Sequence, residues 1–181
     1  RLAFAADLLT IACYIAMTAV LYGLFKPVNR TVSLLAAVFS IVGCTIQGSA
    51  CVFEYAPLIV LKGAQPWSAL KVEELQTLAY LLLKLYSQGY GIALVFFAFF
   101  NLLVGCLAFE STFLPRILGV LMAVSGIGGL TFLAPSFAAK YFPYILATFI
   151  GEGLLFLWLL VAGVNAQRWK ERARAAEECR S

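Results

Sequence analysis

The sequence of 181 residues contains no histidine, and only 12% of its residues are charged. Without histidine, this chain offers no bis-histidine haem ligation and no acid–base chemistry on an imidazole. Soluble domains carry about 25% charged residues, roughly twice the fraction found here. Together with a hydrophobic content of 63%, this shortage of charge argues against a soluble fold and for a membrane protein.

Motifs for metal, redox or nucleotide chemistry are missing as well. None of the five cysteines forms a CxxC pair, and four of them lie inside apolar runs, where a cysteine acts as a small hydrophobic residue. No glycine-rich phosphate loop and no nucleophile elbow is present. We therefore predict no catalytic residue, no metal ligand and no cofactor, and we rank an enzymatic function below the alternatives.

Long apolar runs predict an all-α, polytopic transmembrane helix bundle over residues 1–167, followed by a basic tail over residues 168–181. A helix of about 20 apolar residues crosses a bilayer. We expect a loop at 62–74, an interfacial or extended segment up to Tyr86, and turns at 110–116 and 140–143. The five predicted spans are about 2–25, 30–61, 89–109, 117–139 and 144–164.

The first residue is arginine and an apolar run follows at once, so we expect a helix upstream and six or more spans in the full protein. Five crossings place the turns near 26–30 and 110–116 on the side of the tail. That side holds eight of the 13 Lys and Arg residues, which predicts a cytoplasmic C-terminus. The basic tail is expected to contact anionic membrane lipids and no nucleic acid.

Polar residues in the second run recur at helical steps of four, three, four and three, which places them on one face of a helix. Lipid offers no hydrogen bonds, so this face must meet protein or water. We take this helix as the one around which the others are organised. The face consists of Ser40, Cys44, Gln47, Cys51 and Glu54.

Small and polar residues predict where other helices touch. Ser87, Tyr90 and Asn101 share a face of the third span, and a buried asparagine can hydrogen-bond across helices. We assign helix packing to these three residues and to Cys44 and Cys51. Stripes of small residues, which allow close backbone approach, are Gly91, Ala98 and Gly105 in the third span and Gly119, Ala123 and Gly126 in the fourth.

Three carboxylates lie inside spans at similar predicted depths. Asp7, Glu54 and Glu152 are each about 9–12 Å from the outer end of their helix, at 1.5 Å per residue. Charged groups in spans usually face the bundle interior, so these acids could share an outer-half cavity that holds a ligand or a cation. In the alternative, each carboxylate reaches water separately or caps a helix. The candidate cavity residues are Asp7, Gln47, Glu54, Gln88, Glu152 and, as counter-charge, Lys84.

Several segments resemble a bacterial integral-membrane family, DUF4386. They are AADLL at 5–9, LYGLFKPVNRTVSLLAAVFSIV at 21–42, the run from Ser87 to Leu130 and GEGLLFLWLLVAGV at 151–164; the most specific is LPRILGVL at 114–121. The resemblance implies a helix bundle in a bacterial inner membrane, with more spans than are visible here, and it implies no reaction. Histidines typical of the family near 86–88 and at 101 are replaced by Tyr86 or Gln88 and by Asn101, so no imidazole role carries over.

Three functions remain open from the sequence. The first is a non-catalytic bundle that binds a small ligand, a lipid or a cation in an outer-half polar cavity. The second is an accessory or structural subunit that packs against partner subunits of a larger membrane complex. The third is a transporter or an intramembrane enzyme, which we rank last because no internal repeat and no catalytic constellation is visible.

Overall fold

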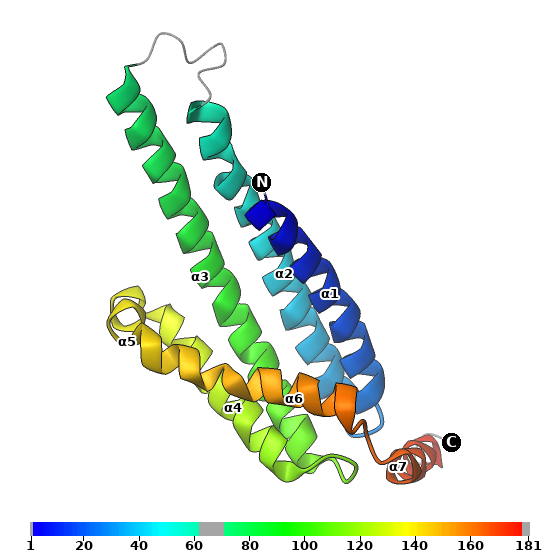
Figure 1. Cartoon of the computed structure of the whole chain (residues 1–181). Coiled ribbons are helices and arrows are strands. Elements are labelled where there is room, and N and C mark those ends of the chain that lie inside the picture. Colours follow the sequence, from blue (N-terminus) through cyan, green and yellow to red (C-terminus); the bar gives the residue numbers. More distant parts are fainter. Residues whose placement is uncertain (1, 62–70, 179–181) are drawn as a thin grey trace.

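The computed structural model describes residues 2–61 and 71–178, and every regular element in these residues is helical (Figure 1). Most of the predicted 62–74 loop lies outside the described residues. The elements are α1 (Leu2–Phe25), α2 (Arg30–Leu61), α3 (Val72–Glu110), α4 (Arg116–Leu130), the short 3₁₀ helix η2 (Thr131–Leu133), α5 (Pro135–Thr148), α6 (Ile150–Val161) and α7 (Ala166–Glu178).

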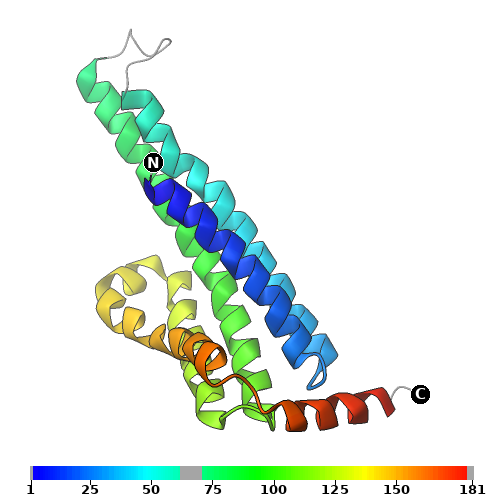
Figure 2. The same cartoon turned by 45° about the vertical axis from the view of Figure 1, so that its right-hand side comes forward.

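Five segments of the described chain are long and apolar enough to cross a membrane: α1, α2, α3, α4 with η2, and α5 with α6. This confirms the predicted all-α bundle with five spans, and the chain is a multi-pass membrane protein. The helices α2 and α3 pack along each other as a long antiparallel pair, with α1 against α2 (Figures 1 and 2). The helices α4 to α6 cover only the half of α3 that leads to Glu110.

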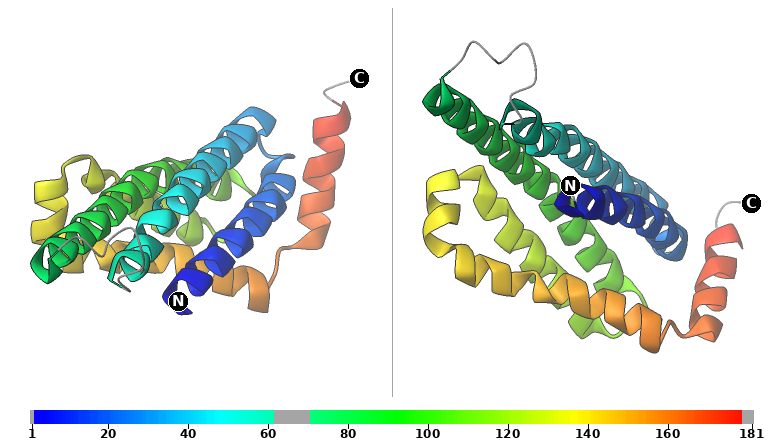
Figure 3. Two further views of the ribbon diagram at one scale, coloured as in Figure 1. Left: turned by 90° about the horizontal axis from the view of Figure 1, so that it is seen from above. Right: turned by 45° about the horizontal axis from the view of Figure 1, so that its top comes forward.

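Three chain segments meet at one end of the bundle, as the alternating spans require. The backbone N–H of Asn165 donates to the carbonyl of Phe113 at 3.3 Å, which joins the α3–α4 turn to the tail. The indole of Trp169 on α7 donates to the carbonyl of Leu24 at the end of α1, at 2.9 Å. The helix α7 therefore runs across this end of the bundle and lies at its edge (Figures 2 and 3).

Small residues bring α3 and α4 into direct backbone contact. A side-chain carbon at Gly105 would lie 2.7 Å from the backbone nitrogen of Ala123 and 2.9 Å from the carbonyl oxygen of Gly119. The stripes predicted from the sequence therefore meet at this crossing, where backbones approach without intervening side chains. Gly91 differs from the prediction, because a side-chain carbon there would meet nothing within 4 Å.

The polar face of α2 is turned into the bundle. Ser40 and Cys51 are fully buried, Cys44 and Gln47 are nearly so, and Glu54 is partly buried. Ser40 shares a hydrogen bond of 2.6 Å with Thr18 on α1, so this face finds its polar partners on a neighbouring helix. The helix α2 lies between α1 and α3, but α3 packs against both α2 and α4, so α3 and not α2 joins the two groups of helices.

The predicted element boundaries are wrong in two places. The segment before Tyr86 is not extended, because α3 is one continuous helix from Val72. The break after α4 falls at Ala134 and not at 140–143, because the residue before Pro135 is disfavoured in helical geometry and has φ −118° and ψ 86°. The predicted turn at 140–143 is instead a kink inside α5, where Pro143 removes a backbone donor.

Candidate functional site

The carboxylate of Glu152 is held by side chains from two other helices. The Tyr14 hydroxyl donates to Glu152 Oε1 at 2.6 Å, and the Asn101 amide donates from Nδ2 to Glu152 Oε2 at 3.0 Å. These contacts connect α1, α3 and α6, at the point where the group formed by α1, α2 and α3 faces the group formed by α4, α5 and α6. Asn101 is fully buried, and its Oδ1 has no hydrogen-bond partner among the described residues.

A break between α5 and α6 places Glu152 in this position. The hydroxyl of Ser125 on α4 donates to the carbonyl of Thr148, and the regular helix resumes at Ile150. Glu152 then falls in the first turn of α6. Gly151 is buried against α4, which brings this first turn close to the bundle.

Tyr14 is fixed by aromatic packing as well as by its hydrogen bond. Its ring lies 4.7 Å from that of Phe97 and 5.9 Å from that of Phe100, centroid to centroid, and both phenylalanines are buried. Such tilted and edge-on pairs contribute about 0.5–1.5 kcal/mol beyond the burial of area. The phenol therefore points at Glu152 from a nearly rigid position.

A partly open cavity of about 300 Å³ lies beside the Glu152 carboxylate. It is enclosed by α1, α2 and α3 on one side and by η2, α5 and α6 on the other. Its wall is mostly aromatic, with a few polar groups among the rings, which is the usual make-up of a small-molecule site. The lining residues are Thr10, Tyr14, Gln47, Tyr90, Leu94, Phe97, Phe132, Phe142, Leu146, Phe149 and Glu152.

A second hollow of about 450 Å³ adjoins this cavity, and the two share four wall residues, Tyr90, Leu94, Phe132 and Phe142. The second hollow lies between α3 and the start of α5. Ser87 and Gln88 from α3 and Ala138 from α5 line it, and both polar residues are exposed. Gln88 therefore lines the second hollow, whereas Gln47 and Glu152 line the first cavity.

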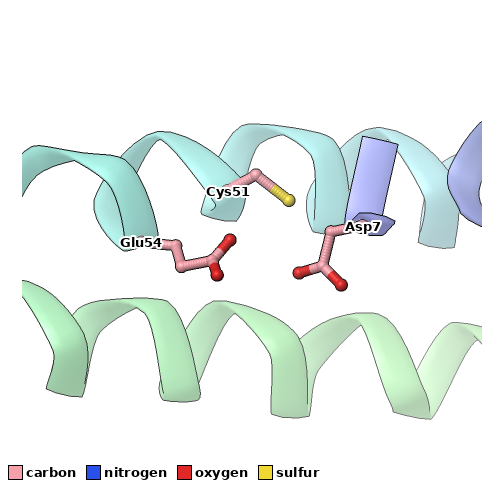
Figure 4. A group of neighbouring side chains, drawn as sticks. All are labelled: Asp7, Cys51 and Glu54. Carbon is pink, nitrogen blue, oxygen red and sulfur yellow. The ribbon is translucent and has the colours of Figure 1, made fainter. Parts of the chain in front are cut away.

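Asp7 and Glu54 meet elsewhere, in a cluster nearer the Leu61 end of α2 and the Val72 end of α3 (Figure 4). Their carboxylate oxygens and the Cys51 thiol all lie within 4.8 Å of one another. Tyr86 on α3 donates to Asp7 Oδ2 at 2.8 Å, while Glu54 Oε2 has no partner among the described residues. This set offers three of the four ligands of a tetrahedral zinc site, and it equally allows two carboxyl groups to share a proton.

The three carboxylates thus do not share one cavity, which corrects the prediction. On α1, Tyr14 lies seven residues beyond Asp7, or about 10 Å deeper. On α3, Asn101 binds Glu152 and Tyr86 binds Asp7. These two partners lie about 22 Å apart along the helix at 1.5 Å per residue. The predicted depth of Glu152 was counted from Tyr144 as the outer end of the last span. That span begins earlier, at Pro135, so Glu152 lies deeper in it than predicted.

Lys84 is not the counter-charge that the sequence suggested. It is exposed on α3, and within residues 2–61 and 71–178 no lysine or arginine nitrogen lies within 4.0 Å of Asp7, Glu54 or Glu152. It lies two residues before Tyr86, the residue that binds Asp7, but its own side chain is exposed. A long flexible lysine there can extend to water.

The residues assigned to helix packing divide into two groups. Cys44 and Cys51 are buried among helices, and Cys44 packs with Ala93 and Phe97. Asn101 is buried too, but it also holds the Glu152 carboxylate. Ser87 and Tyr90 are exposed and line the hollows described above, so they do not pack between helices.

Tyr14 is the functional candidate that the sequence reasoning missed. A signal for it was present, because Asp7, Thr10, Tyr14 and Thr18 follow one another at steps of three, four and four. This is the same polar spacing that we used to orient α2. The aromatic wall from η2 and α5 carried no such signal, because its residues come together only through the breaks at Ala134 and Phe149.

Comparison with known proteins gives one match. The model of a domain of unknown function, DUF4386, matches residues 1–163, which include the five described spans, the Asp7–Glu54 cluster and Glu152. The chain belongs to the DUF4386 family. Neither the curated proteins nor the solved structures contain a match to this chain. Membership in DUF4386 thus confirms the predicted family.

Proposed function

We propose that this DUF4386 protein binds a small molecule with an apolar or aromatic body in the cavity between the α1–α3 bundle and the α5–α6 segment. One observation carries the proposal: a carboxylate positioned by Tyr14 and Asn101 lies on the wall of an aromatic cavity of about 300 Å³. A single oriented polar group among apolar walls gives a site both orientation and affinity.

Matched probes of one shape and three charges test whether the cavity binds a small molecule. They are benzyltrimethylammonium, the neutral 2,2-dimethylpropylbenzene and benzylsulfonate. A ligand that binds only the folded protein raises its stability by mass action. We expect at least one probe to produce a saturable rise in the thermal unfolding midpoint of the purified protein.

The paired variants Leu146→Trp and Leu160→Trp locate that effect. Both leucines are exposed, at 57% and 85%, but only Leu146 lines the cavity. A tryptophan at position 146 should fill the cavity from its wall, so Leu146→Trp should lose the stabilisation by the probe. Leu160→Trp should retain it. No stabilisation by any probe, or equal stabilisation of the two variants, would contradict the proposal.

An accessory subunit is the second candidate, and the length of the α2–α3 pair favours it. The 39 residues of α3 extend over about 58 Å, well beyond a hydrocarbon core of about 30 Å. The projecting part carries exposed apolar side chains such as Tyr80 at 71% and Leu81 at 51%. Native mass spectrometry from membrane vesicles distinguishes the two cases, because an accessory subunit should leave the membrane with stoichiometric partners and not as the bare chain.

We further propose an inner-membrane location with α7 in the cytoplasm and anionic lipids as its contacts. The end of the bundle that carries α7 also carries Lys26, Arg30 and Arg116. The helix α7 adds four further basic residues, among them Arg168, which donates to the carbonyl of Thr112 at 3.1 Å. Basic residues at span ends favour the cytoplasmic side and the headgroups of anionic lipids.

A further inference from the structure

The hydrogen bonds around Glu152 are of the kind that an ionised carboxylate accepts. Tyr14 supplies an O–H and Asn101 supplies an N–H, each to a different oxygen of the carboxylate. An ionised carboxylate is an acceptor on both oxygens, so both contacts fit the negatively charged form.

This negative charge has no cationic partner in the described part of the chain, where no lysine or arginine nitrogen lies within 4.0 Å of Glu152. A charge in a membrane span is costly and is usually paired. The two neutral donors lower that cost, but they leave the negative charge of an ionised carboxylate uncompensated on the wall of the cavity. A positively charged ligand would neutralise it.

The rest of the wall favours a particular kind of cation. Six of the eleven lining residues are aromatic: Tyr14, Tyr90, Phe97, Phe132, Phe142 and Phe149. The faces of aromatic rings carry negative electrostatic potential and attract ammonium groups, including fully alkylated ones. A compact hydrated metal ion gains less here, because divalent ions such as Ca²⁺ and Mg²⁺ seek about six or more oxygen ligands and this wall is mostly ring carbon.

We infer that the cavity binds a small organic cation, an amine or a quaternary ammonium with an apolar body. The charged nitrogen lies beside Glu152, and the apolar body packs among the rings of α3, α5 and η2. This inference rests on the proposed function, since it names the ligand class of the same cavity. Tyr14 and Asn101 act as positioning residues, because they hold the carboxylate at the wall.

The three probes test the sign of the charge directly in the wild-type protein. Benzyltrimethylammonium and 2,2-dimethylpropylbenzene share one shape and differ in charge, while benzylsulfonate carries the opposite charge. We expect the cation to bind at least about tenfold more tightly than its neutral counterpart, and the anion to bind weakest. Equal or tighter binding of the neutral or anionic probe would overturn the inference while leaving the cavity itself established.

Variants of Glu152 identify the group responsible. Glu152→Gln should weaken binding of the cation at least about tenfold and leave the neutral probe unchanged. The control Glu110→Gln alters an exposed carboxylate at the end of α3 and should change neither probe. Glu152→Asp keeps the charge and should keep the preference for the cation, so it replaces the glutamine variant if that one does not fold. Cation binding that survives Glu152→Gln intact would overturn the role of this carboxylate.

Discussion

The hydroxyl of Tyr14 lies 2.6 Å from Oε1 of Glu152, joining two residues that are 138 positions apart in the sequence. Tyr14 belongs to α1, the first span in the chain, and Glu152 to α6, which ends the last. The helix α6 packs mainly on α4, so this hydrogen bond is a specific polar link between the two halves of the bundle. The candidate cavity lies directly beside it.

Removal of the Tyr14 hydroxyl should destabilise the protein measurably. Tyr14→Phe retains the ring contacts but leaves one oxygen of a part-buried carboxylate without its donor, which typically costs about 1–3 kcal/mol. The free energy of unfolding in detergent measures this loss. The control Tyr144→Phe removes a hydroxyl from a side chain that is 75% exposed, and it should have almost no effect. Equal losses in the two variants would show that the link between the halves contributes nothing.

Neutralising Lys84 should leave stability almost unchanged. This lysine is exposed and has no carboxylate of Asp7, Glu54 or Glu152 within 4.0 Å. Surface substitutions of this kind usually change the free energy of unfolding by less than about 0.5 kcal/mol. We therefore expect Lys84→Met to behave as wild type, and Lys84→Met with Glu54→Gln to be additive. A coupling energy above about 1 kcal/mol would instead restore Lys84 as the partner of this acid.

The α3–α4 crossing should not tolerate a single added methyl group. Gly105→Ala places a carbon 2.7 Å from the backbone nitrogen of Ala123, so the helices must separate, at a cost of about 1–3 kcal/mol. Gly91→Ala is the matched control on the same helix, since nothing lies within 4 Å of the added carbon. It should keep or slightly raise stability, because alanine is the better helix former by about 1 kcal/mol. The thermal unfolding midpoints of the two variants measure the difference. Equal midpoints would contradict the close approach of the α3 and α4 backbones at Gly105.

The orientation in the membrane is open to a labelling experiment. In a cysteine-free background, Lys71→Cys marks the start of α3 and Ala175→Cys marks α7, at opposite ends of the bundle. A membrane-impermeant maleimide should label position 71 in intact cells and position 175 only after the membrane is opened. The reverse pattern would place α7 outside and remove the argument from basic residues.

The sequence alone determined the class of this protein and much of its local order. Apolar runs of sufficient length require helices in lipid, because only a helix satisfies its own backbone there, and five such spans are present. The polar spacing from Ser40 to Glu54 predicted which face of α2 is buried, since a helix repeats every 3.6 residues. Both results follow from properties of single helices.

Only the tertiary structure decided which polar groups meet. Equal depth in separate helices suggested one cluster of three acids, but the last span starts earlier than predicted, at Pro135, and Glu152 lies apart from Asp7 and Glu54. The Glu152 site depends on the packing of α6 against α4, where Gly151 lies against Leu121 and Ser125. Such contacts join residues that are distant in sequence, and no periodicity within one helix encodes them. The packing of helices against one another is therefore what placed Glu152 beside Tyr14 and Asn101 and opened the aromatic cavity next to them.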